Sequence, residues 1–128
     1  MIKIRTLIIE NKNYKTLNTL NFGHEKCKPA HSFTYAYIDH YIIHYVVNGC
    51  GKVYFNDECY KVSKGEIFII KPKGVYKYVA DENDPWEYIW IHLNGELTCK
   101  LDTLGVVEKF KSNLFEEMLT AFELENTR

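Results

Sequence analysis

The sequence has no apolar run of membrane-spanning length and no block of charge of one sign. At the N-terminus, MIKIRTLIIENKNY contains only short apolar stretches broken by charge, too little for the apolar core of a signal peptide. The 16 Lys and Arg residues are scattered among 17 Asp and Glu residues, which gives a formal net charge of −1. We therefore expect neither membrane insertion nor nucleic-acid binding by this segment alone.

Paired cysteine motifs are also missing. The four cysteines, at positions 27, 50, 59 and 99, show neither the C-x-x-C spacing of zinc and redox sites nor the density of a secreted disulfide scaffold. This pattern indicates reduced thiols and a cytoplasmic location. One bridge stays open as an alternative, because Cys50 and Cys59 lie on or beside facing arms of a predicted hairpin.

Aromatic residues, by contrast, are abundant. Ten Tyr, seven Phe and two Trp bring the aromatic share to 15%, which favours β structure with an aromatic-lined interior. With 128 residues, of which 46% are hydrophobic, the chain can bury the core of one domain.

Residues 41–79 have the punctuation of a meandering β-sheet, because short apolar runs are interrupted by Gly, Asn-Asp or Pro. Asn56 and Asp57 suit a tight hairpin, since both residue types tolerate positive φ. Connections this short require largely antiparallel pairing. The predicted strands of this region are Tyr41–Asn48, Lys52–Phe55, Cys59–Val62, Glu66–Lys71 and Val75–Val79.

Three further strands flank this region. Phe22–Cys27 and Ser32–Ile38 precede it, and the second of them alternates, with Phe33, Tyr35 and Tyr37 on one face. Trp86–Leu93 follows it, and its alternation makes one face mostly aliphatic and the other aromatic and capable of hydrogen bonding. That second face carries Trp86, Tyr88, Trp90 and His92.

The two ends of the chain differ from the middle. Residues 1–21 are predicted to form an N-terminal arm with one strand, and residues 96–104 have a weak helical spacing of leucines. Asn113–Leu124 is predicted to be an amphipathic helix, with a capping pattern of Asn113 and Glu116 at its start. Such a helix needs a surface to pack on, which can be the barrel, a second copy or further chain.

The stretches VVNGCGKVYFNDECYKVSKGEIFIIKPKG and DENDPWEYIWIHLNG resemble the sensor domain of AraC/XylS-family transcription regulators. The resemblance covers about Phe22 to Gly95 and rests on the order and spacing of its turns and strands. It implies a mainly β, cupin-like (double-stranded β-helix or jelly-roll) barrel over 22–95, after the arm of 1–21. Residues 96–128 would be a helical segment that starts the dimerisation or linker region, with Leu114, Met118 and Phe122 at the dimer contact.

The resemblance also implies a function. The chain would sense a small-molecule effector, a sugar or other small polar molecule, and would form a homodimer in the cytoplasm. DNA would be bound only through a helix-turn-helix domain that lies outside these 128 residues. The two alternatives are a stand-alone cupin enzyme of the isomerase or dioxygenase type, with a non-standard site, and a barrel that binds no small molecule.

The enzyme alternative needs a metal or an acid/base pair, and the residues speak against the metal. In cupin enzymes an H-x-H motif with a glutamate, and a histidine after a P-x-G corner, hold the ion. Here the first motif would fall at His31-Ser32-Phe33, and the residue expected to be the later histidine is Lys77, whose ammonium repels a cation. We therefore predict no metal, no cofactor and no catalytic residue.

The predicted binding site is the aromatic face of Trp86–Leu93. Aromatic rings could be core alone, but inside a barrel they also suit a sugar, whose CH groups stack on them while its hydroxyls meet Tyr, His or indole N–H groups. The resemblance favours Tyr88 and Trp90 most, although the arginine that holds the sugar in the arabinose-responsive member has no counterpart in 32–37. The full predicted set is Tyr88, Trp90, Trp86, His92, Tyr78, His44 and Tyr35.

Overall fold

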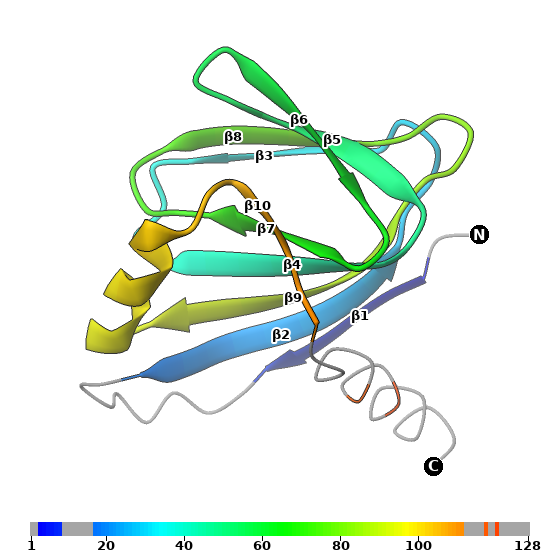
Figure 1. Ribbon diagram of the computed structural model, residues 1–128. Helices are drawn as coiled ribbons and strands as arrows, with labels where there is room; N and C mark the ends of the chain where they lie inside the picture. Colours follow the sequence, from blue (N-terminus) through cyan, green and yellow to red (C-terminus); the bar gives the residue numbers. More distant parts are fainter. Residues whose placement is uncertain (1–2, 9–16, 112–116, 118–119, 121–128) are drawn as a thin grey trace.

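The computed structural model describes residues 3–8, 17–111, 117 and 120 of the chain. Figure 1 shows two sheets that face each other, with a short helix at one end. The elements are β1 (Lys3–Ile8), β2 (Asn18–Lys26), β3 (Ser32–Ala36), β4 (Tyr41–Asn48), β5 (Cys50–Phe55), β6 (Glu58–Ser63), β7 (Glu66–Ile70), β8 (Val75–Ala80), β9 (Glu87–Asn94), the 3₁₀-helix η1 (Glu96–Thr103) and β10 (Val107–Lys109).

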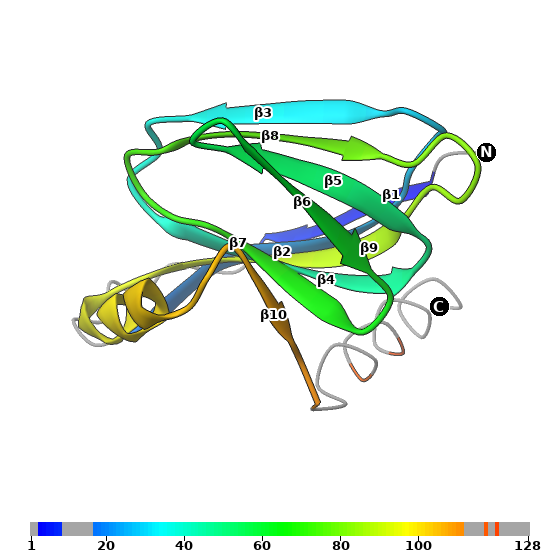
Figure 2. The same cartoon turned by 45° about the horizontal axis from the view of Figure 1, so that its top comes forward.

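All pairings between these strands are antiparallel, as the short connections require. The first sheet has the order β1-β2-β9-β4-β7-β10, and the second has the order β3-β8-β5-β6. Figure 2 shows the second sheet lying over the first. The chain crosses between the sheets several times, so that β9 lies between β2 and β4. A mainly β, jelly-roll arrangement was expected and is confirmed.

Two tight turns explain much of the local geometry. The β5–β6 hairpin turns at Asn56 and Asp57, whose φ angles are 52° and 63°, as predicted from their tolerance of positive φ. Gly49, between β4 and β5, has φ 73°, and a side chain there would overlap the backbone of Asp84 and Pro85. Strand β5 therefore begins in direct contact with the loop before β9, an approach that only glycine allows.

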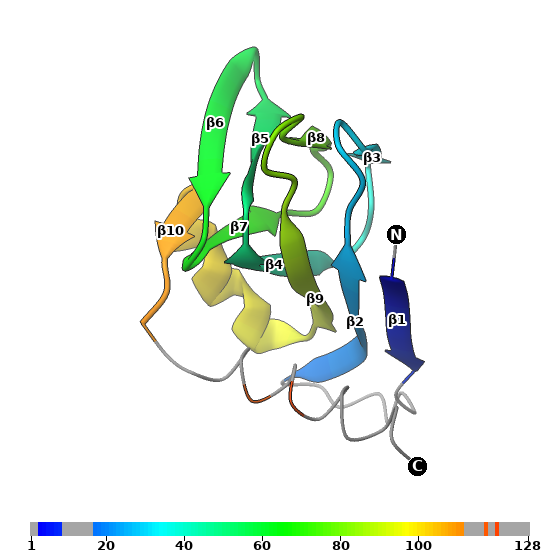
Figure 3. The same cartoon turned by 90° about the vertical axis from the view of Figure 1, so that its right-hand side faces the viewer.

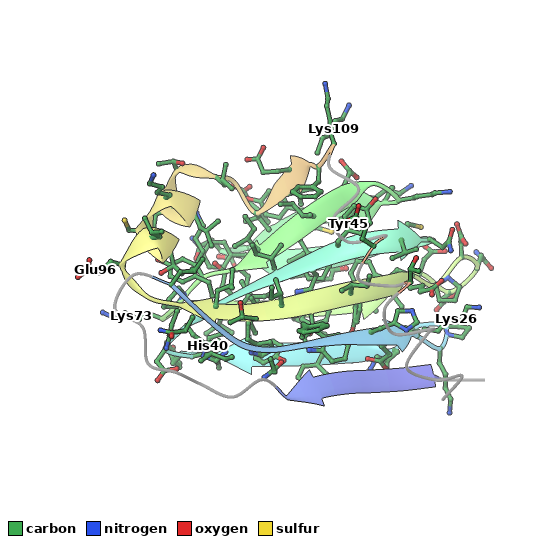
Figure 4. All side chains as sticks on the ribbon, turned by 90° about the horizontal axis from the view of Figure 1, so that it is seen from below. Lys26, His40, Tyr45, Lys73, Glu96 and Lys109 are labelled. Carbon is green, nitrogen blue, oxygen red and sulfur yellow. The ribbon has the colours of Figure 1, made fainter. Side chains whose placement is uncertain are left out.

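The strands bury two separate apolar clusters. Between the sheets, the packed residues include Phe68, Tyr78, Trp86 and Tyr88. On the opposite face of the first sheet, a smaller cluster is formed by Tyr45, Ile67, Ile69 and Ile89. Tyr45 projects from this outer face in Figure 4. Strand alternation therefore places a cluster rich in aromatic rings between the sheets and a smaller, mostly aliphatic cluster on the outer face.

Some of the predicted element boundaries and contacts differ from the structure. Strand β2 begins at Asn18 rather than at Phe22, because it continues along β9 past a bulge. Tyr37 leaves the alternation of β3: its φ is 55°, its backbone N–H bonds to Gly74 O, and it is 75% exposed. The weak leucine spacing of 96–104 is a 3₁₀-helix, and its Leu97 is exposed.

The bridge between Cys50 and Cys59 does not form. All four cysteines are free thiols, and the hairpin register sets Cys50 opposite Ser63 and Cys59 opposite Tyr54. The two thiols are therefore offset along the hairpin rather than facing each other, which rules out bridge geometry without backbone movement.

Two other expectations concern the ends of the chain and membranes. Leu114, Met118 and Phe122, the predicted dimer contacts, lie outside the described residues, as does most of the predicted helix Asn113–Leu124. Among the residues that the structure describes, no helix is long and apolar enough to cross a membrane.

Candidate ligand-binding site

The inner face of β9 carries the aromatic residues that the alternation predicts. Tyr88 belongs to the interior cluster and Trp90 packs against it, whereas Ile89 and Ile91 belong to the outer cluster. Trp86, just before β9, also lies in the interior. Burial decreases along this face, since Trp86 and Tyr88 are almost fully buried but Trp90 and His92 are partly exposed.

Strands β3 and β8 of the second sheet carry two more of the predicted residues, which lie across the interior from the inner face of β9. Tyr35 stacks on Tyr78, with ring centroids 6.2 Å apart, and meets His92 edge-on at 6.4 Å. Figure 3 shows β3 on the same side of the barrel as β2, above the first sheet. The partly exposed rings of Tyr35, Trp90 and His92 therefore lie on facing sheets near one side of the barrel.

His44, on β4, stands among these rings as a neutral imidazole. It is 2% exposed, stacks on Phe68 at 4.3 Å, and meets the rings of Tyr78 and Tyr88 edge-on at 5.0 and 5.1 Å. Burial, followed by the nearby His92, lowers the pKa of His44 well below its usual value. Its Nδ1 has no hydrogen-bond partner in the described part of the chain.

A hydrogen-bonded histidine pair lies at the end of the face. His40 Nε2 is 2.7 Å from His92 Nδ1, and His40 Nδ1 is 2.9 Å from Asp39 Oδ1. His40 lies toward the end of the barrel that carries Lys73 and Glu96, away from the end with Lys26 (Figure 4). Burial and the neighbouring His40 lower the pKa of His92 to about 4. The loop residue His40 has no periodicity that could have assigned it to the site.

This shift predicts acid sensitivity of the fold. The pKa of His92 is about 4 in the folded protein, compared with an ordinary value of 6.5. The contribution of neutral His92 to the free energy of unfolding is therefore complete above pH 6.5 and is lost as the pH falls towards 4. Allowing for its partial exposure, we expect His92 to account for a loss of about 1–2 kcal/mol in the free energy of unfolding. Urea unfolding at pH 7 and pH 4.5 measures it. His92→Asn should lose less on acidification than wild type, and an equal loss would contradict the assignment.

Glu25, on β2, is an interior residue that the sequence reasoning missed. It is 7% exposed, its Oε1 accepts a hydrogen bond from the Tyr88 hydroxyl at 3.3 Å, and its Oε2 is 3.6 Å from His31 Nε2. Its neighbour His24 faces the other way, with Nε2 2.6 Å from Glu87 Oε2. The predicted strand Phe22–Cys27 contained this residue, but its two faces are both polar in part, so alternation gave no signal.

A groove lies elsewhere on the described part of the barrel, and none of the predicted ligand-binding residues lines it. This groove has a volume of about 1510 Å³ and is bordered by the β5–β6 hairpin, the β7–β8 turn and the segment between η1 and β10. Lys71 Nζ closes one side by donating to the backbone carbonyl of Leu104 at 2.6 Å. The Tyr41 hydroxyl donates to Asp102 Oδ1 at 2.7 Å nearby.

Lys77, the residue at the predicted metal-ligand position, lies outside the interior. Its side chain is exposed and borders the groove, whereas Tyr76 and Tyr78 on either side of it are buried in the interior cluster. Tyrosine rings, rather than an ammonium group, therefore occupy the inner positions after the corner. Within residues 3–8, 17–111, 117 and 120, no group of three His, Cys, Asp or Glu residues is placed to hold a metal ion.

Comparison with known proteins shows a family match and several similar regulators. A family model described as the AraC-like ligand binding domain matches residues 20–101. The Msm operon regulatory protein of Streptococcus mutans is 33% identical over 119 residues, covering 87% of this chain and 42% of that protein. The raffinose operon transcriptional regulatory protein RafR of Pediococcus pentosaceus is 38% identical over 91 residues, covering 63% of this chain and 32% of that protein.

A third relative is the lactose operon transcription activator of Staphylococcus xylosus, which is 27% identical over 79 residues. That alignment covers 62% of this chain and 28% of the relative. The chain thus spans less than half the length of the curated relatives it matches.

Solved structures confirm the barrel type. The protein YhaK from Escherichia coli superposes with a TM-score of 0.68 at 13% identity, covering 87% of this chain and 52% of that one. The cupin domain of Cnp3 from Schizosaccharomyces pombe gives 0.60 at 14% identity, covering 81% and 72%. The fold is therefore a cupin-like barrel, as the resemblance implied.

Proposed function

Because this chain belongs to the AraC-like ligand-binding domain family, we propose that it senses a carbohydrate on behalf of a transcription regulator. The observation that carries the proposal is the partly exposed aromatic face made by Tyr35, Trp90 and His92. Flat rings beside hydrogen-bonding groups suit a sugar, whose CH groups pack on an aromatic plane while its hydroxyls are bonded at the edge.

The names of two relatives narrow the proposed effector class. One regulates a raffinose operon and another a lactose operon, and both of these sugars contain a galactosyl ring. A galactoside is therefore the first effector to test. Within the site, Trp90 would stack on the ring, and Tyr35 and His92 would meet its hydroxyls. Trp86, Tyr78, Tyr88 and His44 are more deeply buried, and a direct contact from them stays a prediction.

The proposed output is a change in the attached DNA-binding part of a longer protein. The chain would form a homodimer, with Leu114, Met118 and Phe122 at the contact. Effector binding would shift the populations of two arrangements of this dimer. Regulation rather than catalysis is favoured because the three relatives are named as operon regulators.

A sugar panel tests the proposal directly. Purified protein is titrated with raffinose, lactose, galactose and arabinose, and unfolding is followed by calorimetry. A ligand at roughly 100 times its dissociation constant stabilises the folded state by about 2.7 kcal/mol, which raises the melting temperature by several degrees. We expect at least one galactoside to give this shift, with sorbitol, an open-chain polyol, as the control. A panel in which no sugar raises the melting temperature beyond sorbitol contradicts the proposal.

A further inference from the structure

Glu25 places a carboxylate in the barrel interior, directly across from a proposed binding strand. In the β2–β9 register Glu25 pairs with Tyr88, and it is 7% exposed. A buried carboxylate is costly unless its oxygens are bonded, so its partners decide what it does there.

The protein itself uses little of this carboxylate's bonding capacity. One hydrogen bond, from the Tyr88 hydroxyl at 3.3 Å, is long, and His31 Nε2 stands 3.6 Å from the other oxygen. Within residues 17–111, no lysine or arginine pairs with Glu25. An ionised carboxylate can accept about four hydrogen bonds, so Glu25 has acceptor capacity left for a ligand.

The free acceptor positions of the Glu25 carboxylate lie beside Trp90, on which the sugar is proposed to stack. Gly23, on the same face of β2, pairs with Trp90 in the register, so β2 puts no side chain opposite the indole. Diagonal neighbours on adjacent strands lie about 7–8 Å apart, and long side chains bridge that distance. A pyranose ring stacked on Trp90 would therefore present hydroxyl groups to Glu25.

Apart from His31, whose Nε2 lies 3.6 Å from Glu25 Oε2, the titratable neighbours of Glu25 on the interior face are uncharged. Burial lowers the pKa of His44 well below its usual value and, with His40 nearby, that of His92 to about 4, so both imidazoles are neutral at pH 7. Burial also raises the pKa of the Cys27 thiol to about 12, which keeps it uncharged. The carboxylate of Glu25 thus determines the electrostatic potential of this face, and no side chain on β9 neutralises its charge.

We propose that Glu25 is a specificity-determining residue of the effector site, which accepts hydrogen bonds from the hydroxyls of a neutral sugar and excludes anionic sugars. Phosphorylated sugars and uronates would meet a like charge in a poorly hydrated site, where repulsion is weakly screened. This inference rests on the proposed carbohydrate-sensing function and deepens it, because it selects the charge class of the sugar.

Calorimetric titration of the 128-residue chain tests the inference with probes that share one ring. Galactose, lactose and raffinose are the neutral probes, and galacturonate and galactose 6-phosphate are the anionic ones. Wild type should bind galactose at least roughly 10-fold more tightly than galacturonate. Glu25→Gln keeps the side-chain shape. It should weaken the binding of neutral sugars by roughly 10- to 100-fold and reduce the difference in affinity between neutral and anionic sugars.

A matched control removes a partly buried carboxylate from the opposite face of the same strand pair. Glu87 bonds to His24 and Asn48 on the outer face, so Glu87→Gln should leave the sugar preference unchanged even if it lowers stability. Glu25→Asp, which keeps the charge on a shorter stem, should retain the exclusion of anions. Far-UV circular dichroism and the melting temperature verify that each variant folds, and the wild-type comparison of galactose with galacturonate needs no variant.

The outcomes separate this inference from the proposed function. Neutral sugars that bind wild type and Glu25→Gln equally well, or galacturonate that binds wild type as tightly as galactose, overturn the role of Glu25 and leave carbohydrate sensing intact. If no neutral sugar binds wild type, carbohydrate sensing fails and the role of Glu25 fails with it. A loss of neutral-sugar binding in Glu25→Gln alone, with Glu87→Gln unaffected, supports both.

Discussion

Replacing Trp90 by alanine should weaken effector binding by roughly 30- to 150-fold, a loss of about 2–3 kcal/mol in binding free energy. Trp90 is partly exposed, packs against the interior cluster and meets Tyr88 edge-on at 5.9 Å. Its partly exposed indole is the ring on β9 on which we propose that a sugar stacks. Removal takes away this surface, while the deeper core formed by Trp86 and Phe68 remains packed.

The same substitution should cost less in stability than in binding. A fully buried aromatic residue contributes about 3–5 kcal/mol to the free energy of unfolding, and a half-buried one at the margin of the core contributes less. We expect Trp90→Ala to unfold cooperatively, with a loss of about 1–2 kcal/mol. Isothermal titration with the best sugar of the panel, together with urea unfolding, measures both effects.

Ile91→Ala supplies the control for this comparison. Ile91 follows Trp90 on β9 but faces the outer cluster, so its truncation destabilises the same strand without touching the interior. It should lower the free energy of unfolding and leave sugar affinity unchanged. Unchanged affinity in Trp90→Ala, or an equal loss of affinity in Ile91→Ala, would show that Trp90 is not the stacking surface.

Trp86→Ala should have the largest effect on stability, a loss of about 3–5 kcal/mol in the free energy of unfolding, because it leaves a cavity in the packed interior of the barrel. Trp86 is 1% exposed, stacks on Phe68 at 5.1 Å and contacts Tyr88 at 5.7 Å. On its other side the ring rests on the backbone of β5, where a side chain at Gly51 would overlap it. With a total stability of about 5–15 kcal/mol for domains of this kind, the variant would stand near its unfolding threshold.

Guanidinium unfolding monitored by circular dichroism measures this loss. Trp86→Phe keeps an aromatic ring in contact with Phe68 and should recover much of the stability, so it allows sugar affinity to be measured in a folded protein. Wild-type affinity in Trp86→Phe would support a structural role for Trp86. A loss below about 1 kcal/mol in Trp86→Ala would mean that the ring is not part of the packed core.

The strand pattern and the turn chemistry were predictable from sequence. Periodicity of two identified the inner residues of β9, and Asn56-Asp57 identified the β5–β6 hairpin, because both signals are local. The resemblance supplied the barrel type, which family and structure comparisons confirm. The binding role of the predicted residues stays a prediction.

Contacts between distant strands were not predictable. Glu25 gains its interior position only because β2 pairs with β9, and no local pattern in a strand with polar residues on both faces reveals that pairing. Lys77 illustrates the same difficulty: the corner before β8 decides which residues face inward, and it selects Tyr76 and Tyr78. The offset of Cys50 and Cys59 follows from the hairpin register, which spacing along the chain does not specify.

The pairing of β2 with β9 also has a consequence for the order of folding. Its side-chain bonds join residues far apart in sequence, with separations of 76 for Asn18 and Asn94 and 63 for His24 and Glu87. Closing so long a loop is slow compared with forming the β5–β6 hairpin, so we expect this sheet to close late. Glu25 and Tyr88 would then meet only in the final step, during synthesis as in refolding, and a nascent chain would be unable to recognise its effector until β9 has left the ribosome.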